Sequence, residues 1–291
     1  MAADTEPAES VEEESAPKEG AFKQPARLIA RLAEWIAEQD MDDLRGAFRR
    51  AGLNIERRDP DYHFVHKYFG HNAKKLRTGL DDEAFMELAR EVRDAKRTFL
   101  YYNRLYTLYQ AVHNLALRFP DQAVRFLEAG VFRGGSAYFL GRSAQQAMGE
   151  RVEIVAVDTF TGHPEIDIGA REEGAHTPGT FGGVDVDDVR EYLAPLPFVE
   201  VVQGRIQNVA PKLDGDLHLI HSDVDLRAPT SYVLQLAVER LVPGGMVIVD
   251  DYGFVTCPGV KKAVDVFREA HAQRFVVHLL DSGQALVVRT G

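Results

Sequence analysis

Two pairs of aspartates follow short apolar segments in the second half of the chain. Asp223 and Asp225 close the stretch LHLIHSDVDL, and Asp250 and Asp251 stand near the end of GGMVIVDDYG. Because neighbouring parallel strands end at the same edge of a sheet, we expect these acids to share one cleft. Crowded carboxylates repel one another unless they are protonated or bridged by a cation, and oxygen ligands suit Mg²⁺ or a similar ion. Solvated strand-end acids or helix caps would explain one pair, whereas two pairs favour a divalent metal site.

A glycine-containing turn indicates where a second ligand binds. The stretch FLEAGVFRGGSA, residues 126–137, reads as a strand, a turn with Gly130, Gly134 and Gly135, and the start of a helix. Glycines let the backbone approach a ligand and leave helix N–H groups free to contact it. The spacing G-x-x-x-G-G differs from the dinucleotide pattern, and the acid Glu128 would repel a pyrophosphate but suits a cation. A purely structural turn remains an alternative on the glycines alone.

The next apolar segment, VEIVAVD, ends in Asp158, thirty residues after Glu128. An acid at that position can accept both hydroxyl hydrogens of a ribose. Nicotinamide cofactors and S-adenosylmethionine both contain that ribose, but the first carries phosphates and the second a sulfonium and an α-amino group. An acidic turn without a pyrophosphate pattern favours S-adenosylmethionine.

These residues must be positioned by an α/β fold of the Rossmann-like type. After Pro120, short and nearly continuous apolar runs typical of strands buried on both faces alternate with helical stretches. The runs are 123–129, 152–157, 198–202, 217–222, 246–249, 275–280 and 285–288. The last two are joined by Asp281-Ser282-Gly283, which suits an antiparallel hairpin. The prediction is a mostly parallel, seven-stranded sheet whose last strand is reversed.

Helical periodicity dominates the chain before Pro120. Apolar spacing predicts helices at about 25–36, 42–50, 81–95 and 96–119. The last carries five aromatic residues, which either pack the helix onto the following domain or place one or two tyrosines in an acceptor pocket. They are Phe99, Tyr101, Tyr102, Tyr106 and Tyr109.

The segment 161–188 is too polar and glycine-rich for a core element, yet it lies between two predicted strands. A connection of this length in a compact domain is usually functional or disordered, and we interpret it as a lid. It contains His176.

Composition limits the classes of partner. The net charge is −11, but residues 1–20 hold seven acids against one lysine. We expect 1–22 to be a disordered acidic tail, 23–119 a helical N-terminal region and 120–291 the cofactor-binding domain. An acidic body argues against nucleic acid or anionic membrane as the main partner, and the sequence leaves a homo-oligomer open. Without a signal peptide or a long apolar run, the expected location is the cytoplasm.

Other candidate ligands carry less weight. Cys257 is the single cysteine, so a thiolate zinc cluster and an intrachain disulfide are excluded, and a small packing role is expected. His63, His66 and His71 lie in an irregular aromatic stretch without an acid at metal-ligand spacing, so a zinc role there is not favoured.

Five motifs in order resemble one known family. FLEAGVFRGGS, VAVDTFTGHPE, SDVDL, LVPGGMVIVDDYG and CPGVKKAVDVF are similar to the macrocin O-methyltransferase family over roughly residues 99–267. Members are class I enzymes that use S-adenosylmethionine to methylate sugar hydroxyls on natural products. The chain departs from that family at Leu226-Arg227, where a leucine and a tyrosine are usual, and in a longer helical region before Phe99. Both departures bear on the acceptor, a small hydroxylated molecule, more than on methyl transfer.

The resemblance also implies roles for individual residues. Asp223, Asp250 and Asp251 would ligate Mg²⁺ or a similar divalent cation, and Asp223 would be the candidate general base. His176 and His221 are further candidates for the base. The residues expected to line S-adenosylmethionine are Glu128, Gly130, Phe132, Gly134, Ser136, Asp158, Thr159, Gly204 and Arg205.

These features together predict a metal-assisted O-methyltransferase. The sulfonium methyl is already activated, so the enzyme must align an acceptor oxygen and make it more nucleophilic, as a divalent ion and a nearby base can do. Two alternatives remain: an NAD-dependent oxidoreductase, disfavoured by Glu128 and the glycine spacing, and a non-catalytic binding protein on a methyltransferase fold, disfavoured by the four aspartates.

Overall fold

The computed structural model describes residues 82–168 and 176–291. The acidic tail, the helices expected at 25–36 and 42–50, and the three histidines between 63 and 71 lie outside the described residues. Within the described ranges, no helix combines the length and apolar character that crossing a membrane requires.

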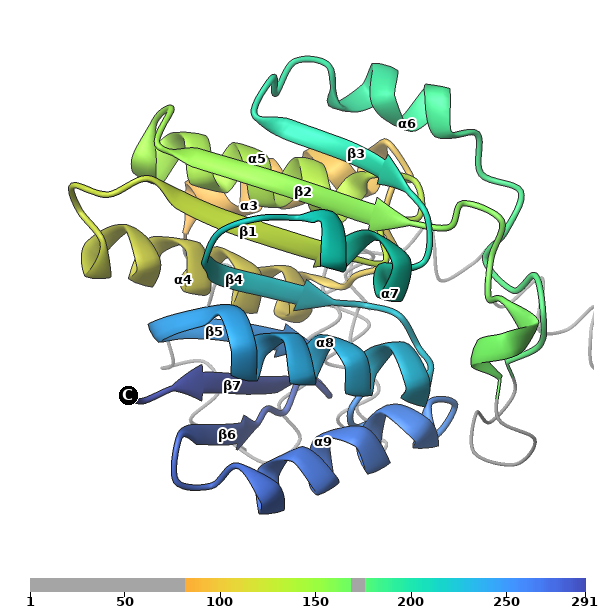
Figure 1. The fold of residues 1–291 in the computed structure, drawn as a ribbon. Helices are drawn as coiled ribbons and strands as arrows, with labels where there is room; N and C mark the ends of the chain where they lie inside the picture. The colour runs from red at the N-terminus through yellow and green to blue at the C-terminus, as the bar shows by residue number, and fades with distance from the viewer. Residues whose placement is uncertain (1–81, 169–175) are drawn as a thin grey trace, which may run out of the picture. The chain divides into compact units, whose positions relative to one another are not determined.

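A seven-stranded sheet forms the centre of the fold, in the order β3-β2-β1-β4-β5-β7-β6 (Figure 1). Strands β1 to β5 pair in parallel, and β7 runs antiparallel to both of its neighbours, β5 and β6. The strands are β1 (Val124–Ala129), β2 (Val152–Asp158), β3 (Val199–Gln203), β4 (Leu217–Ser222), β5 (Leu241–Val249), β6 (Phe275–Leu279) and β7 (Ala285–Arg289). The predicted α/β class, the seven strands and the reversed last strand are confirmed.

Helices cover both faces of this sheet (Figure 1). One face carries α3 (Glu83–Asp94), α4 (Tyr102–Arg118) and α5 (Gly135–Met148), whose apolar residues share a core cluster with Phe126 and Ile154. The other face carries α7 (Ile206–Val209), α8 (Arg227–Arg240) and α9 (Pro258–Ala270), which pack on Leu127 and Val155. Alternate residues of one strand therefore supply both cores, as expected for a strand buried on two faces.

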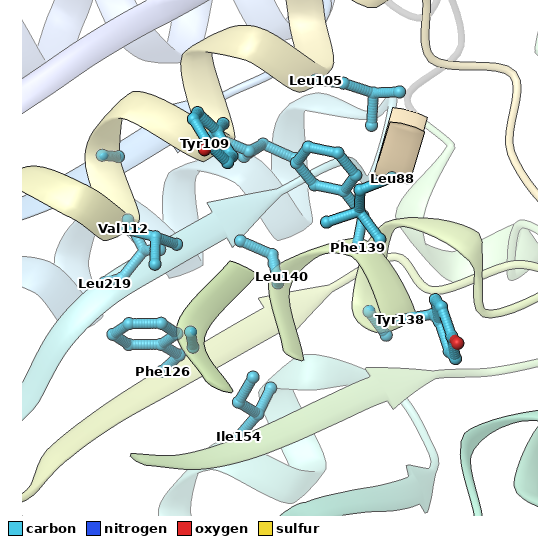
Figure 2. Close-up of a cluster of buried hydrophobic side chains, with 14 of the residues drawn as sticks. Leu88, Leu105, Tyr109, Val112, Phe126, Tyr138, Phe139, Leu140, Ile154 and Leu219 are labelled. Carbon is cyan, nitrogen blue, oxygen red and sulfur yellow. The ribbon is translucent and has the colours of Figure 1, made fainter. Parts of the chain in front are cut away.

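Figure 2 shows the first of these cores, in which side chains from α3, α4, α5 and the strands interlock. Tyr109 lies beside Phe139 with ring centroids 6.5 Å apart, and Phe85 packs edge-on to Phe139 at 6.0 Å. Tyr102 and Tyr109 are buried, and none of the four tyrosines of 101–109 is among the described residues that line the main cavity. The packing interpretation of these aromatics therefore holds for Tyr102, Tyr106 and Tyr109.

The helix expected at 96–119 begins six residues later than predicted, at Tyr102. Lys96 has a left-handed backbone with a φ of 56°, which ends the previous helix, and residues 97–101 form an irregular link. The carbonyl of Arg97 accepts a hydrogen bond from the amide of Gly135, at the start of α5. The link therefore serves the glycine turn, and helical periodicity alone could not reveal this.

The polar segment between β2 and β3 is partly regular. It contains a short 3-10 turn, η3 (Glu165–Asp167), and its last residues begin α6 (Val186–Leu193). Asp185 caps α6 by accepting a hydrogen bond from the amide of Asp187 at 2.9 Å. Three residues of 176–183 line the main cavity: His176, Thr180 and Phe181. This position is compatible with the lid interpretation.

Candidate active site

A cavity of about 270 Å³ opens at the carboxyl ends of β1, β2 and β4. This is the edge at which parallel α/β sheets bind their ligands. Its walls come from the glycine turn, the 97–100 link, the 162–181 segment and the aspartates that follow β4 and β5. The residues that line it include Arg104, Gly130, Phe132, Asp158, His163, His176, Phe181, Asp223, Asp225, Asp251 and Cys257.

The glycine turn lies directly against the chain that follows β4. Gly130 has a φ of 90°, and a Cβ added to it would lie 1.8 Å from the carbonyl oxygen of Asp223. A Cβ on Gly135 would lie 2.6 Å from the backbone of Arg97. Only glycine permits these approaches, so the turn and Asp223 are fixed beside each other at the cavity.

Asp158 holds the same turn in place through its side chain. Its Oδ2 accepts hydrogen bonds from the amides of Val131 and Phe132 at 2.7 and 2.8 Å. Its Oδ1 accepts one from the amide of Phe160 at 2.7 Å. Asp158 lines the cavity, as expected for a residue near the cofactor, but its carboxylate is already bonded to three amides of the chain. This use of the carboxylate was not foreseen from the sequence.

Glu128 takes a different place from the one expected. Its side chain is fully buried and is absent from the described residues that line the cavity. One carboxylate oxygen, Oε1, lies 2.8 Å from Nδ1 of His221, and the other, Oε2, has no hydrogen-bond partner among the described residues. The expectation that Glu128 lines S-adenosylmethionine therefore differs from the structure, because strand alternation turns this side chain into the core.

A buried ionic network extends from Glu128 through His221 to Asp250. Nε2 of His221 lies 3.0 Å from Oδ2 of Asp250, and all three side chains are fully buried. The two carboxylates outweigh the cost of burial and raise the pKa of His221 to about 10. The imidazole is therefore charged at neutral pH and donates to both acids, which makes it unsuited to act as a general base.

Three further carboxyl groups meet at the cavity: Asp223, Asp225 and Asp251. Burial, followed by the charges of neighbouring aspartates, raises the pKa of Asp223 and of Asp225 well above the usual range. Asp225 and Asp251 have positive φ angles of 58° and 64°, which cost strain for residues with a side chain. The concentrated charge and the strain at these two positions are typical of a functional site.

Arg104 of α4 lies among the three aspartates expected to bind magnesium. Its Nη2 is 2.9 Å from Oδ1 of Asp251, 3.1 Å from Oδ2 of Asp250 and 3.7 Å from Oδ1 of Asp223. The charges of these aspartates raise the pKa of Arg104 despite its burial, so the guanidinium stays charged. A fixed cation therefore occupies the centre of the expected ligand set.

Asp250 is also fully engaged as a hydrogen-bond acceptor. Its Oδ1 accepts from Arg104 Nε at 3.2 Å and from Gln284 Nε2 at 2.5 Å. Its Oδ2 faces His221 and Arg104, so each oxygen has two donors. Since a carboxylate has about four acceptor positions, none remains for a metal, and Asp250 does not line the cavity in the described part of the chain. The set of Asp223, Asp250 and Asp251 does not fit Mg²⁺ in this arrangement.

A second group of side chains lies where the 161–168 and 176–188 segments meet the end of β4. Nε2 of His163 is 3.1 Å from Nδ1 of His176 and 3.6 Å from Oδ2 of Asp225. Nε2 of His176 is 3.3 Å from Sγ of Cys257. Burial lowers the pKa of His176, and it lowers that of His163 to about 4, so both rings are neutral at pH 7.

The remaining cofactor-site candidates are mostly brought together. Phe132, Ser136, Thr159, Gly204 and Arg205 all line the cavity. Gly134 caps α5 with a φ of 85° and is not among the described lining residues. Arg205 donates from Nε to Asp167 at 2.9 Å, which ties the 3-10 turn η3 to the end of β3.

Sequence reasoning missed three residues that the geometry makes important: Arg104, His163 and Gln284. A signal existed for Arg104, because it is a basic residue on the apolar face of an otherwise tyrosine- and leucine-rich helix. His163 stands five residues after Asp158 and next to a proline, in a segment already interpreted as a lid. Nothing in the local sequence marks Gln284, whose partner Asp250 lies on another element.

Comparisons with known proteins point to one family. Residues 47–284 match the family model described as Macrocin-O-methyltransferase (TylF). The chain is 33% identical over 141 residues to the 8-demethyl-8-(2,3-dimethoxy-alpha-L-rhamnosyl)-tetracenomycin-C 4'-O-methyltransferase of Streptomyces olivaceus, covering 45% of this chain and 54% of that protein. It is 29% identical over 211 residues to the mycinamicin III 3''-O-methyltransferase of Micromonospora griseorubida, covering 66% and 80%.

The fold is also similar to solved structures. A structure of the O-methyltransferase NovP superimposes with a TM-score of 0.58 at 23% identity, covering 67% of this chain and 83% of that one. The calicheamicin methyltransferase CalS11 gives a TM-score of 0.51 at 18% identity, covering 74% and 95%. At these identities the likeness concerns the fold alone. The match to the Streptomyces olivaceus methyltransferase spans only about half of that protein's length.

Proposed function

This chain belongs to the macrocin O-methyltransferase family, and from that membership we propose that it transfers the methyl group of S-adenosylmethionine to a hydroxyl of a small natural product, such as a sugar. One observation supports this most strongly. The turn expected to hold the cofactor touches the residue expected to act on the acceptor, because Gly130 packs against the backbone of Asp223. Both residues line the same cavity, so the two reacting partners would meet there.

Asp223 is the proposed general base. Its side chain is 26% exposed and lines the cavity, so an acceptor hydroxyl can reach it. A raised carboxyl pKa brings a base closer to the working pH, which favours proton transfer. In the proposed step the hydroxyl proton passes to the Asp223 carboxylate as the oxygen lone pair forms the new O–C bond. The C–S bond breaks with its electron pair going to sulfur, which leaves neutral S-adenosylhomocysteine.

His176, a further candidate for the base, is less well placed for that role. Its Nδ1 is within hydrogen-bond distance of His163 and its Nε2 within reach of Cys257, so both ring nitrogens already have neighbours. Its pKa is lowered by burial, which weakens it as a proton acceptor. We therefore propose that His176 contributes to the binding of a ligand in the cavity and does not accept the proton of the acceptor hydroxyl.

The aromatic wall of the cavity supports an acceptor with an apolar portion. Phe99 of the link stacks on Phe132 of the glycine turn at 5.2 Å, and Phe181 of the lid segment packs edge-on to Phe132 at 5.9 Å. Phe99 and Phe181 remain 64% and 44% exposed, which is high for phenylalanine. The relatives named above act on a rhamnosyl-tetracenomycin and on mycinamicin III, and we propose an acceptor of the same broad kind, a glycosylated small molecule.

We also propose that transfer depends on a divalent cation, which when bound would lower the pKa of the acceptor hydroxyl. The support is electrostatic. Among the described residues of the site, Glu128 and the four aspartates following β4 and β5 face two cations, Arg104 and His221. Because Arg104 lies between the aspartates first expected to be ligands, such an ion requires a different set of ligands.

A thermal-shift comparison tests the choice of cofactor. We expect S-adenosylhomocysteine to raise the melting temperature and NADH to leave it unchanged, because the glycine turn beside Glu128 lacks a pyrophosphate pattern. Stabilisation by NADH alone would favour an oxidoreductase. Stabilisation by S-adenosylhomocysteine without turnover on any hydroxylated acceptor would favour a non-catalytic binding protein.

Asp158→Asn is expected to weaken S-adenosylhomocysteine binding by roughly 10- to 100-fold. The change removes the charge from an acid that fixes the amides of Val131, Phe132 and Phe160, and each hydrogen bond to a charged group is worth about 1.5–3 kcal/mol, part of which the amide retains. Calorimetric titration measures the affinity. Asp187→Asn, an exposed change on α6, is the matched control. Unchanged affinity for Asp158→Asn would refute the proposed cofactor role.

A further inference from the structure

His163, His176 and Asp225 present three metal-binding atoms to one point at the cavity. One ring nitrogen of His163, one of His176 and a carboxylate oxygen of Asp225 all lie within 4.8 Å of one another. Two of the three separations are 3.1 and 3.6 Å. In a tetrahedral zinc site with bonds of about 2.0–2.2 Å, ligand atoms lie about 3.3–3.6 Å apart. The two separations from His163 are therefore close to those between ligand atoms in such a site.

The chemical state of these groups suits a metal. Each imidazole has a ring nitrogen that can offer a lone pair to a metal ion. Asp225 is crowded by Asp223 and Asp251, and a cation would relieve that repulsion. Two imidazoles and one carboxylate are borderline ligands that suit zinc, cobalt or iron better than magnesium. The strained φ of Asp225 keeps its carboxylate near the two histidines at a cost that a bound ion would offset.

The position of Arg104 favours ion binding at His163, His176 and Asp225 over binding at the aspartates first expected to be ligands. The guanidinium already lies between Asp223, Asp250 and Asp251, and Asp250 has no free acceptor position. An ion there would have to displace a buried cation that is held by several charged partners. By contrast, no described cation contacts His163 or His176, and Asp225 lines the cavity within reach of His163.

We propose that His163, His176 and Asp225 bind a divalent transition-metal ion such as zinc, beside the proposed base. Cys257 borders the site, with Sγ 3.8 Å from Oδ1 of Asp225, and water or an acceptor oxygen would complete the coordination. The binding of the ion stands on geometry alone. Its assistance to the acceptor rests on the proposed function, because the site would then hold the hydroxyl near Asp223.

Cobalt binding tests this proposal directly. The full-length chain is freed of metal by dialysis against a chelator and titrated with Co²⁺, whose visible absorption is intense in four-coordinate sites and weak in six-coordinate oxygen sites. We expect one equivalent of Co²⁺ to bind per chain with the intense bands. His163→Gln and His176→Gln should each weaken binding at least about 100-fold, because loss of even an outer partner of a metal ligand costs 10–100-fold.

Two control variants separate this site from its neighbours. Asp250→Asn should leave Co²⁺ affinity within about threefold of the wild-type value, since Asp250 contacts none of the three ligand atoms. His278→Gln, an exposed change on β6, should have no effect. Melting curves of each variant show whether it folds. A weak six-coordinate spectrum that responds to Asp250→Asn but not to the histidine variants would overturn the proposal.

Failure of this site and failure of the proposed function have different signatures. If only the metal site is wrong, Co²⁺ does not bind in the expected way while S-adenosylhomocysteine still does. If only the proposed function is wrong, Co²⁺ binds and responds to both histidine variants while S-adenosylhomocysteine does not bind. Absence of any Co²⁺ binding to the folded wild-type chain would leave the two histidines as a hydrogen-bonded pair between Asp225 and Cys257, and would also overturn the proposal.

Discussion

Asp223→Asn is expected to lower kcat by about 10²- to 10⁴-fold, the usual contribution of a positioned general base. The amide keeps the size of the carboxyl group but cannot take the hydroxyl proton. Asp223 lines the cavity next to the glycine turn and carries a carboxyl whose pKa is raised by burial and by Asp250 and Asp251. The measurement is the initial rate of S-adenosylhomocysteine formation at saturating cofactor and acceptor.

Two controls show whether that loss comes from the reaction step. The affinity of Asp223→Asn for S-adenosylhomocysteine should stay within about threefold of wild type, because the cofactor turn is held by Asp158 and not by the Asp223 side chain. Asp187→Asn on α6 should have the wild-type rate. A kcat for Asp223→Asn within threefold of wild type would remove Asp223 from the role of base.

His221→Ala is expected to reduce the free energy of unfolding by about 3–5 kcal/mol, the usual cost of removing one partner from a buried ion pair. The imidazolium separates Glu128 from Asp250, and all three side chains are fully buried. Without it the two carboxylates are left without their shared cation, although Asp250 retains Arg104 and Gln284. Urea unfolding at pH 7 measures the loss.

The control for this variant is another histidine on the same sheet. His278→Ala, exposed on the edge strand β6, should change the unfolding free energy by less than about 0.5 kcal/mol. His221→Gln restores one hydrogen bond without the charge. Its loss of unfolding free energy should therefore lie between the losses of His221→Ala and His278→Ala. A loss below 1 kcal/mol for His221→Ala would mean that the network is not held by the imidazolium.

Much of the fold follows from local sequence because the strands are short, apolar and separated by polar stretches. The run 217–222 matches β4 at both ends, and the Asp281-Ser282-Gly283 link joins two antiparallel strands as expected. The misplaced start of α4 has a local cause: Lys96 adopts a left-handed conformation that most residues avoid. Residue types between Lys96 and Tyr101 give no sign of it, since lysine and arginine are good helix formers.

The candidate site was predictable where strand ends determine it and unpredictable where partners are distant. Asp158, Asp223 and Asp251 line the cavity because Asp158 ends the parallel strand β2 and the other two follow β4 and β5. Glu128 does not, because alternation along β1 places it on the face covered by α4. Arg104 pairs with Asp250, 146 residues away, and no pattern within either segment specifies such a contact.

Transfer of a labelled methyl group tests the central claim most directly. The purified chain is incubated with S-adenosylmethionine labelled in its methyl group and with a panel of glycosylated small molecules, and products are examined by mass spectrometry and NMR. The account predicts one labelled methyl on a hydroxyl oxygen of the acceptor, with an equal amount of S-adenosylhomocysteine, and neither product from Asp223→Asn. A labelled methyl on carbon or nitrogen, or no S-adenosylhomocysteine above the enzyme-free blank from a chain that binds the cofactor, would contradict it.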